Sequence, residues 1–349
     1  MAEPAESVAT LEIGRRRRPV DLSRVPSVLT SDSDGPLPLV VTPEVPGVDL
    51  VTWARGARGE IGTWLARHGA VLFSGFDLAS AAELERFAEA TGTTLFGDYG
   101  DLPREPHGGK VYGTTPYPSD RTILFHNESS HQHRFPRRLF FLCLTAAESG
   151  GATALVDCRR LLTALPRPVR ARFEERHLRY VRNFTPGIDV SWQQFFHTGE
   201  RARVEAACRT AGVTTTWLPG GRLRIEERAP AVAWHPDTGE ASFFNQIQLH
   251  HPSRLSQDVR ESLLSLMPEE DLPRNVTFGD GSPIPDAMVD EIARRAEELA
   301  VDRPWSEGDV VLVDNLLVAH GRRPYTGARK VVVTMGDMAE TADVAPAFA

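Results

Sequence analysis

The chain of 349 residues is 41% hydrophobic and 25% charged, and its formal net charge is −8. This composition is that of a globular protein. It excludes collagen-like, wholly disordered and membrane-bundle classes, because the longest nearly uncharged apolar run, residues 139–147, is too short to span a bilayer. The acidic excess disfavours generic attraction to nucleic acid or anionic lipid, so we expect neither as a partner.

The N-terminal part differs in composition from the rest. Residues 1–30 hold Arg15 to Arg18 and several Ser and Pro, with little periodicity. This pattern predicts a flexible leader, and a docking arm for an acidic partner is the alternative. No apolar segment follows a basic start, so no secretory signal is visible. We expect residues 31–349 to form a single domain in the cytoplasm.

The first half of the chain predicts helices around short strands. Apolar residues at helical spacing indicate helices over 50–65 and 81–90, with an apolar β run at 70–73 between them. Residues 91–119 are rich in Gly, Pro and Tyr and predict a loop. Further β runs are predicted at 123–125, 139–145 and 153–156, and a helix interrupted by proline at 161–179.

The second half alternates strand candidates with Gly and Pro turns. An amphipathic helix is predicted over 285–300. Many short strands with few long helices predict a fold that is mostly β with added helices, built on a sandwich or barrel-like core. The strand candidates are 214–217, 223–225, 231–234, 242–247, 309–313 and 329–334.

The three cysteines lie far apart in the chain. Cys143, Cys158 and Cys208 form no CxxC pair. Their odd number and wide spacing argue against a disulfide framework and against a thiolate zinc site. A reducing compartment fits this pattern best.

A candidate metal site begins at His126-Asn127-Glu128, directly after the apolar run 123–125. Residues two apart on a strand point to the same face, so the imidazole and the carboxylate are expected to converge. Such a triplet alone is a weak signal. If Glu128 were only a loop residue, the carboxylate would come from Asp157 or Asp314.

A second histidine lies at the far end of the chain. The apolar run 309–313 leads into a polar turn and then to His320. One carboxylate and two imidazoles form the 2-His-1-carboxylate facial triad, which leaves positions on Fe(II) open for an organic acid and O2. An arginine one strand beyond His320 could pair bidentately with the carboxylate of that acid.

With these motifs in this order, the chain resembles the TauD/TfdA family of Fe(II)- and 2-oxoglutarate-dependent dioxygenases. Within the family it is most similar to the SyrP-like members associated with peptide natural-product biosynthesis. The resemblance runs from about His68 to about Gly336 and implies a double-stranded β-helix (jelly-roll) core. The segments that carry it are 68–76, 117–118, 125–130, 150–153, 244–246, 279–282, 314–315 and 320–325.

The resemblance implies which residues hold the cofactors. It places Fe(II) on His126, Glu128 and His320, with Asn127 pointing away from the metal. It also implies that Thr153, after a double glycine, hydrogen-bonds the 2-oxoglutarate carboxylate.

The arginine that pairs with the distal carboxylate of 2-oxoglutarate is best matched by Arg329. The family often spaces this arginine further from the histidine than the nine residues found here. Arg322 and Arg323 therefore compete with Arg329. The strand argument favours Arg329, because Arg322 is expected in the turn after His320.

The implied reaction consumes 2-oxoglutarate and O2, releases succinate and hydroxylates a substrate. We expect an amino acid or an amino-acid-derived molecule as substrate, either free or tethered to a carrier protein, in natural-product biosynthesis. Desaturation, epoxidation or cyclisation at the same iron site is the alternative outcome. Halogenation is not expected, because a halide would need the metal position that Glu128 takes.

Two further classes compete with an iron oxygenase. A hydrolytic or isomerising zinc enzyme would use the same three ligands but would give the arginine-bearing strand no role. A non-enzymatic jelly-roll binding protein would not need an intact ligand set.

The substrate pocket is expected under two loops, 91–119 and 183–197. Their aromatic residues are predicted either to line the pocket or to pack as ordinary core. These residues are Tyr99, Tyr117, Phe184, Trp192, Phe195 and Phe196.

Overall fold

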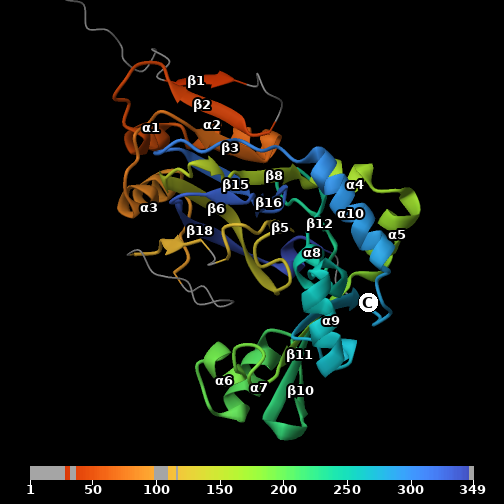
Figure 1. Ribbon diagram of the computed structural model, residues 1–349. Helices are drawn as coiled ribbons and strands as arrows, with labels where there is room; N and C mark the ends of the chain where they lie inside the picture. Colours follow the sequence, from red (N-terminus) through yellow and green to blue (C-terminus); the bar gives the residue numbers. More distant parts are fainter. Residues whose placement is uncertain (1–27, 32–36, 98–108, 115–116, 346–349) are drawn as a thin grey trace, which may run out of the picture.

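The computed structural model describes residues 28–31, 37–97, 109–114 and 117–345 (Figure 1). Its largest sheet has seven strands, and its neighbours pair antiparallel except for β2 and β3, which are parallel. In spatial order the strands are β1 (Val28–Ser31), β2 (Leu39–Pro43), β3 (Ala70–Phe73), β15 (Val310–Asp314), β6 (Arg134–Thr145), β18 (Lys330–Glu340) and β4 (Tyr112–Gly113).

The central strands of this sheet are buried on both faces. Alternate side chains of a strand point to opposite faces, and on β6 Phe140 and Leu142 join one hydrophobic cluster while Leu139 and Phe141 join another. The first cluster includes the apolar faces of three helices. These are α1 (Leu50–Gly56), α2 (Arg58–His68) and α3 (Ala81–Ala90), which cover one face of the sheet (Figure 1).

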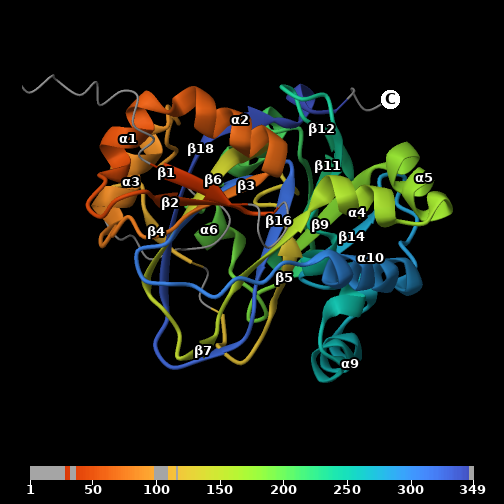
Figure 2. The same ribbon diagram turned by 90° about the horizontal axis from the view of Figure 1, so that it is seen from above.

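A smaller three-stranded sheet packs against the other face. Its strands are β5 (Ile123–His126), β16 (Val318–Arg322) and β8 (Thr153–Asp157), with β16 in the middle. Leu155 and Val318 point into the cluster shared with the large sheet, whereas Val156 and Ala319 point to the opposite side. On that side lie α4 (Cys158–Ala164), α5 (Arg167–Arg176) and α10 (Asp286–Leu299), so two sheets are enclosed between two layers of helices (Figure 2).

A four-stranded sheet and two short two-stranded pairs complete the fold. The four-stranded sheet runs in the order β10 (Thr214–Leu218), β11 (Arg222–Ala229), β9 (Leu178–Phe184) and β14 (Arg274–Phe278). The pairs are β12 (Val232–Trp234) with β13 (Ala241–Phe243), and β7 (Ser149–Gly150) with β17 (Tyr325–Thr326). The remaining helices are α6 (Trp192–Phe195), α7 (Arg201–Thr210), α8 (Ile247–His250) and α9 (Gln257–Leu266).

Local signals explain where several elements begin and end. Asp49 caps α1 by accepting from the Thr52 N–H, and Ser80 caps α3 by accepting from the Glu83 N–H. Helix α2 ends at Gly69, whose φ of 75° lies in the left-handed region that glycine favours. Strand β3 can therefore begin at the next residue.

The expected fold class needs one correction. Helices are as prominent as strands, so the structure is a mixed α/β fold with several sheets and not a mostly β one. The sequence did not predict α7 or α9, because α7 is rich in arginine and α9 buries none of its side chains. The helix expected over 161–179 is α4 and α5, and its last residues belong to β9.

A strand crosses the expected N-terminal boundary. Strand β1 pairs with β2 from Val28 to Ser31, so the boundary expected at residue 30 falls inside a strand. Residues 1–27, with Arg15 to Arg18, lie outside the described residues. Within the described part of the chain, no helix is both long and apolar enough to cross a bilayer.

Gly321 allows β5 and β16 to approach closely, and its replacement tests this contact. An alanine Cβ at this position would lie 2.6 Å from the Ile123 carbonyl oxygen. We expect Gly321→Ala to lower the free energy of unfolding by about 1–3 kcal/mol, measured by urea denaturation. Gly62→Ala in α2 is the control, because nothing lies within 4 Å of the added Cβ; it should add about 0.5–1 kcal/mol. Equal stabilities of the two variants would contradict the close approach.

Candidate metal and cofactor site

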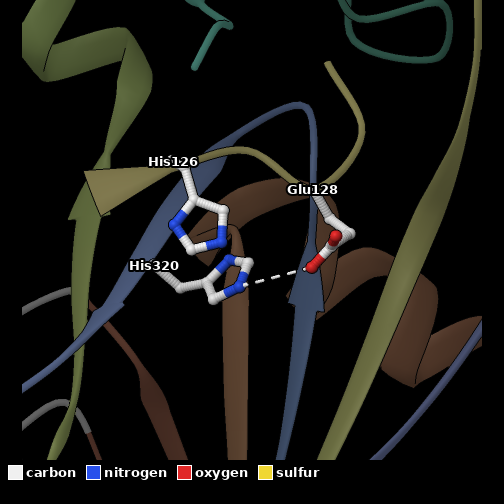
Figure 3. Close-up of side chains that lie close together, drawn as sticks. All are labelled: His126, Glu128 and His320. Atoms are coloured by element: carbon white, nitrogen blue, oxygen red, sulfur yellow. Dashed lines mark ion pairs between the residues drawn. The ribbon is translucent and has the colours of Figure 1, made fainter. Parts of the chain in front are cut away.

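The two predicted histidine ligands face each other across neighbouring strands. His126 at the end of β5 is the direct cross-strand partner of His320 in β16. Directly opposite residues of an antiparallel pair project to the same face. Their ring centroids are accordingly 4.3 Å apart, and the two imidazoles meet in Figure 3.

Glu128 joins them by a different route from the one expected. It lies in a turn after β5 and not on the strand, so strand alternation does not bring it to the histidines. The buried side chain of Asn315 holds this turn instead. Its Oδ1 accepts from the Glu128 N–H at 2.7 Å, and its Nδ2 donates to the carbonyls of Glu128 and Pro136 at 2.9 and 2.8 Å.

The three side chains form a donor set that fits one divalent metal ion. The candidate ligand atoms of His126, Glu128 and His320 all lie within 4.8 Å of one another, and His320 Nε2 is 3.9 Å from Glu128 Oε2 (Figure 3). Ligand atoms bound at roughly 2.1 Å on one face of a metal ion lie about 3 Å apart, so the set has to close by up to about 1.8 Å around the ion.

The hydrogen bond of His126 selects the nitrogen that can bind a metal. Its Nδ1 lies 2.8 Å from the Leu124 carbonyl oxygen. An N–H at Nδ1 that donates to this carbonyl leaves the lone pair of Nε2 for a metal.

Asn127 points away from the donor set, as its position between two ligands requires. Its Nδ2 donates to the Asn315 carbonyl at 2.7 Å, and its Oδ1 accepts from the Asn245 N–H at 3.2 Å. Its own carbonyl accepts from Gln246 Nε2 at 3.0 Å. The segments 244–246 and 314–315, noticed in the sequence without a role, therefore fix the turn that carries Glu128.

The two alternative carboxylates have other partners. Asp157 caps α4 and pairs with Arg159 Nη2 at 2.8 Å. Asp314 lies 3.0 Å from His235 Nε2, and this pair is buried. Among the residues that the structure describes, His126, Glu128 and His320 form the one group suited to a metal.

Arg329 and Thr153 lie together beside this group. Arg329 Nε donates to the Gly151 carbonyl at 2.8 Å, and its Nη2 is 3.5 Å from Thr153 Oγ1. Burial lowers the pKa of the Arg329 guanidinium, and the positive charge of Arg322 lowers it further. No carboxylate of the described residues pairs with Arg329, so the pocket holds a half-buried cation that suits an anionic ligand.

The two competing arginines are occupied elsewhere. Arg322 lies in β16 and not in a turn, which corrects the expectation, and its Nη atoms donate to the carbonyls of Tyr117, Pro118 and Arg121. Arg323 pairs with Glu297 at 2.8 Å and with Asp302 at 2.9 Å.

A cavity of about 540 Å³ connects these groups. It is lined by the three candidate ligands and by Thr153, Arg322 and Arg329. Both predicted roof loops reach it, through Thr114 and Tyr117 from the first and through Ile188 and Asp189 from the second.

Most of the predicted pocket aromatics do not line this cavity. Phe184 and Trp192 are buried in a separate hydrophobic cluster, against which Phe195 and Phe196 pack. Tyr117 does line the cavity, and Tyr99 lies outside the described residues. Phe184 and Trp192 are thus core residues, whereas the partly buried Phe195 and Phe196 line a second cavity of about 220 Å³.

Comparison with known proteins supports the same chemistry. The sequence model described as "Taurine catabolism dioxygenase TauD, TfdA family" matches residues 33–335. The dapdiamide synthesis protein DdaC of Enterobacter agglomerans is 34% identical over 274 residues, which cover 78% of this chain and 83% of that protein. A clavaminate synthase-like protein of Arabidopsis thaliana is 30% identical over 320 residues, which cover 86% and 93%.

The fold agrees with that of a solved oxygenase. PvcB, described as an Fe, alpha-ketoglutarate dependent oxygenase from an isonitrile synthetic pathway, matches with a TM-score of 0.52 at 14% identity. The match covers 92% of this chain and 96% of PvcB. Taken with the family match, the chain belongs to the TauD/TfdA family of Fe(II)- and 2-oxoglutarate-dependent dioxygenases, and it is an enzyme that acts on a small-molecule substrate with these two cofactors.

Proposed function

We propose that this dioxygenase hydroxylates an amino acid or an amino-acid-derived molecule in natural-product biosynthesis. The observation that carries the proposal is one cavity that holds two imidazoles, a carboxylate and an arginine without a carboxylate partner in the described chain. The names of two similar proteins support the biosynthetic context, since one refers to dapdiamide synthesis and the other to an isonitrile pathway. The substrate enters either free or tethered to a carrier protein.

In this proposal His126, Glu128 and His320 hold Fe(II). Fe(II) with 2-oxoglutarate and O2 supplies oxidation of a C–H bond, coupled to conversion of 2-oxoglutarate into succinate and CO2. His126 binds through Nε2, because Nδ1 faces the Leu124 carbonyl. The ring centroid of Phe141 lies 5.1 Å from that of His320, and this packing limits rotation of the His320 ring.

Arg329 and Thr153 bind 2-oxoglutarate. The half-buried guanidinium of Arg329 pairs with the distal carboxylate, and the Thr153 hydroxyl adds a hydrogen bond to the cosubstrate. The carbonyl of Gly151 fixes the guanidinium through Nε and leaves its other edge for the ligand. Arg322 serves the site indirectly, because it ties the segment 117–121 to β16 beside His320.

Glu128 sets the outcome as oxygenation and not halogenation. A halide and a carboxylate compete for the same position on a cation, and the turn that presents Glu128 is held by three hydrogen bonds of Asn315. Desaturation, epoxidation and cyclisation use the same protein ligands and remain the alternative products of this site.

The finer classification belongs to the same proposal. The two facing sheets, with β5, β8 and β16 in the smaller one, form the double-stranded β-helix core, and the chain falls in the SyrP-like subgroup. The chain is divided into a leader of residues 1–30 and a single catalytic domain of residues 31–349, and β1 spans the boundary between them. Three unpaired, buried cysteines support a cytoplasmic location.

A succinate-release screen tests the proposed function. The protein with Fe(II), 2-oxoglutarate and O2 is offered free amino acids and aminoacyl carrier proteins. We expect succinate and a product heavier by one oxygen, or lighter by two hydrogens for the alternative outcomes. His126→Ala and His320→Ala should bind no iron and release no succinate while their circular dichroism is unchanged.

The control for this screen is His197→Ala, which changes an exposed histidine outside the cavity. It should keep iron binding and turnover. Near wild-type turnover of either ligand variant with iron present, or a chlorinated main product in high chloride, would contradict the metal assignment.

Arg329→Ala tests the cosubstrate site. Removal of one partner of a desolvated charge pair costs about 2–5 kcal/mol, so the apparent KM for 2-oxoglutarate should rise at least about tenfold. Arg323→Ala should leave this KM unchanged, because its ion pairs lie outside the cavity lining. If Arg329→Ala leaves the KM for 2-oxoglutarate unchanged and Arg322→Ala or Arg323→Ala raises it, the arginine that binds 2-oxoglutarate is Arg322 or Arg323 and not Arg329.

Asn315→Ala tests how Glu128 is positioned. The substitution leaves the Glu128 N–H and two carbonyls without their buried partner, so we expect metal affinity to fall about 10–100-fold and stability by about 1–3 kcal/mol. Equilibrium Mn(II) binding and urea denaturation measure the two effects. Asn275→Ala removes another buried amide, away from the site. Asn275→Ala should lower stability without lowering metal affinity. Equal metal affinity in the two variants would show that Asn315 does not position Glu128 for metal binding.

A further inference from the structure

The cavity around the metal site carries a surplus of positive charge. Among the described residues, four arginines line it, Arg254, Arg274, Arg322 and Arg329, against two carboxylates, Glu128 and Asp189. With the histidines neutral this leaves two positive charges, in a chain whose formal net charge is −8. A divalent metal ion and dianionic 2-oxoglutarate cancel each other, so they leave the surplus in place.

Most of these arginines already have a partner or an assigned role. Arg322 donates to three carbonyls, and Arg329 is the proposed partner of 2-oxoglutarate. Arg254 Nη1 lies 3.4 Å from Asp290 Oδ1. Among the described residues, the guanidinium of Arg274 has neither a carboxylate nor a hydrogen-bond acceptor.

Arg274 lies next to a second arginine, Arg182. Arg274 begins β14 and lies directly across from Arg182 of β9, so two like charges are neighbours. Asp189 lies 3.5 Å from Arg182 Nη2, and the Arg182 guanidinium lies 4.4 Å from the centre of the Phe195 ring. Asp189 thus pairs with Arg182, whereas no carboxylate of the described residues pairs with Arg274.

Arg274 also stands between two cavities. Together with His250 it lines both the 540 Å³ cavity and a second one of about 220 Å³. Its neighbours in the larger lining include Leu263, Leu272 and Pro273. A half-buried cation in such an apolar wall is costly to desolvate unless an anion accompanies it, and the pairing with an anion is stronger there than in water.

We propose that Arg274 binds a carboxylate or phosphate group of the organic substrate. This inference rests on the proposed function and adds the charge class of its substrate. Arg274 comes from the four-stranded sheet, whereas the two histidines come from the three-stranded sheet, so the anionic group orients the substrate across the cavity between them. A free amino acid supplies the group as its carboxylate, and a carrier-tethered substrate supplies it as the phosphate of a phosphopantetheine arm.

Binding calorimetry with matched acidic and neutral probes tests the proposal. The full-length protein, loaded with Mn(II) and 2-oxoglutarate, is titrated with free amino acids and their carboxamides, and with phosphopantetheine and pantetheine. We expect at least one anionic probe to bind at least about tenfold more tightly than its neutral counterpart, which corresponds to about 1.4 kcal/mol. Amino-acid discrimination indicates a free substrate, and phosphopantetheine discrimination indicates a tethered one.

The variants decide whether Arg274 is responsible. Arg274→Ala should lose the discrimination, and Arg274→Lys should keep part of it, because lysine retains the charge without the fork. Arg179→Ala is the control: Arg179 lies on the same sheet, pairs with Glu226 at 3.4 Å and does not line the cavity. It should bind the probes as the wild type does.

Two results would overturn the inference. One is equal discrimination in Arg274→Ala and the wild type, and the other is a panel in which no anion binds better than its neutral partner. The same titrations report 2-oxoglutarate binding separately. If the wild-type protein does not bind 2-oxoglutarate, the proposed function is wrong. The comparison of anionic with neutral probes does not depend on 2-oxoglutarate, so it tests Arg274 in either case.

Discussion

The site depends on the register in which β5 pairs with β16. This register sets His126 directly opposite His320, so two imidazoles from distant parts of the chain reach the same face. A slip by one residue would turn one of them to the opposite face. Gly321 permits the close approach of the strands, since any Cβ there would press on the Ile123 carbonyl. The hydrophobic clusters on both sides of the small sheet then hold the register against slippage.

A network of buried side-chain amides positions the third candidate ligand, Glu128. Glu128 lies beyond the end of β5, where no ladder fixes the backbone, and Asn315 supplies the missing partners from a turn 187 residues away in sequence. Asn127 and Gln246 satisfy the groups that remain in the same turn. Buried polar groups are costly when unpaired, and a fully paired network is rigid. The carboxylate is therefore presented in one position, which a metal ligand needs.

Three arginines of similar sequence context have different surroundings. Arg323 pairs with two carboxylates, Arg322 donates to backbone carbonyls beside the cavity, and Arg329 lies half-buried next to Thr153. The spacing of these arginines from His320 did not show which of them binds 2-oxoglutarate. The strand that contains His320 extends to Arg322, so Arg322 does not lie in a turn. The helices α7 and α9 were also not predicted from the sequence. The structure buries only Val204 and Cys208 of α7 and no residue of α9.

The sequence by itself determined the chemistry of this protein. The triplet around Glu128, the distal His320 and the short apolar runs beside them predicted the candidate ligands and the strands that carry the two histidines, because residue type and apolar runs are local properties of the sequence. Only the tertiary structure decided how Glu128 reaches the histidines, which arginine remains without a carboxylate, and that Phe184 and Trp192 are core. Each of these depends on contacts between residues far apart in the chain, such as Asn315 with Glu128, and no local pattern encodes them.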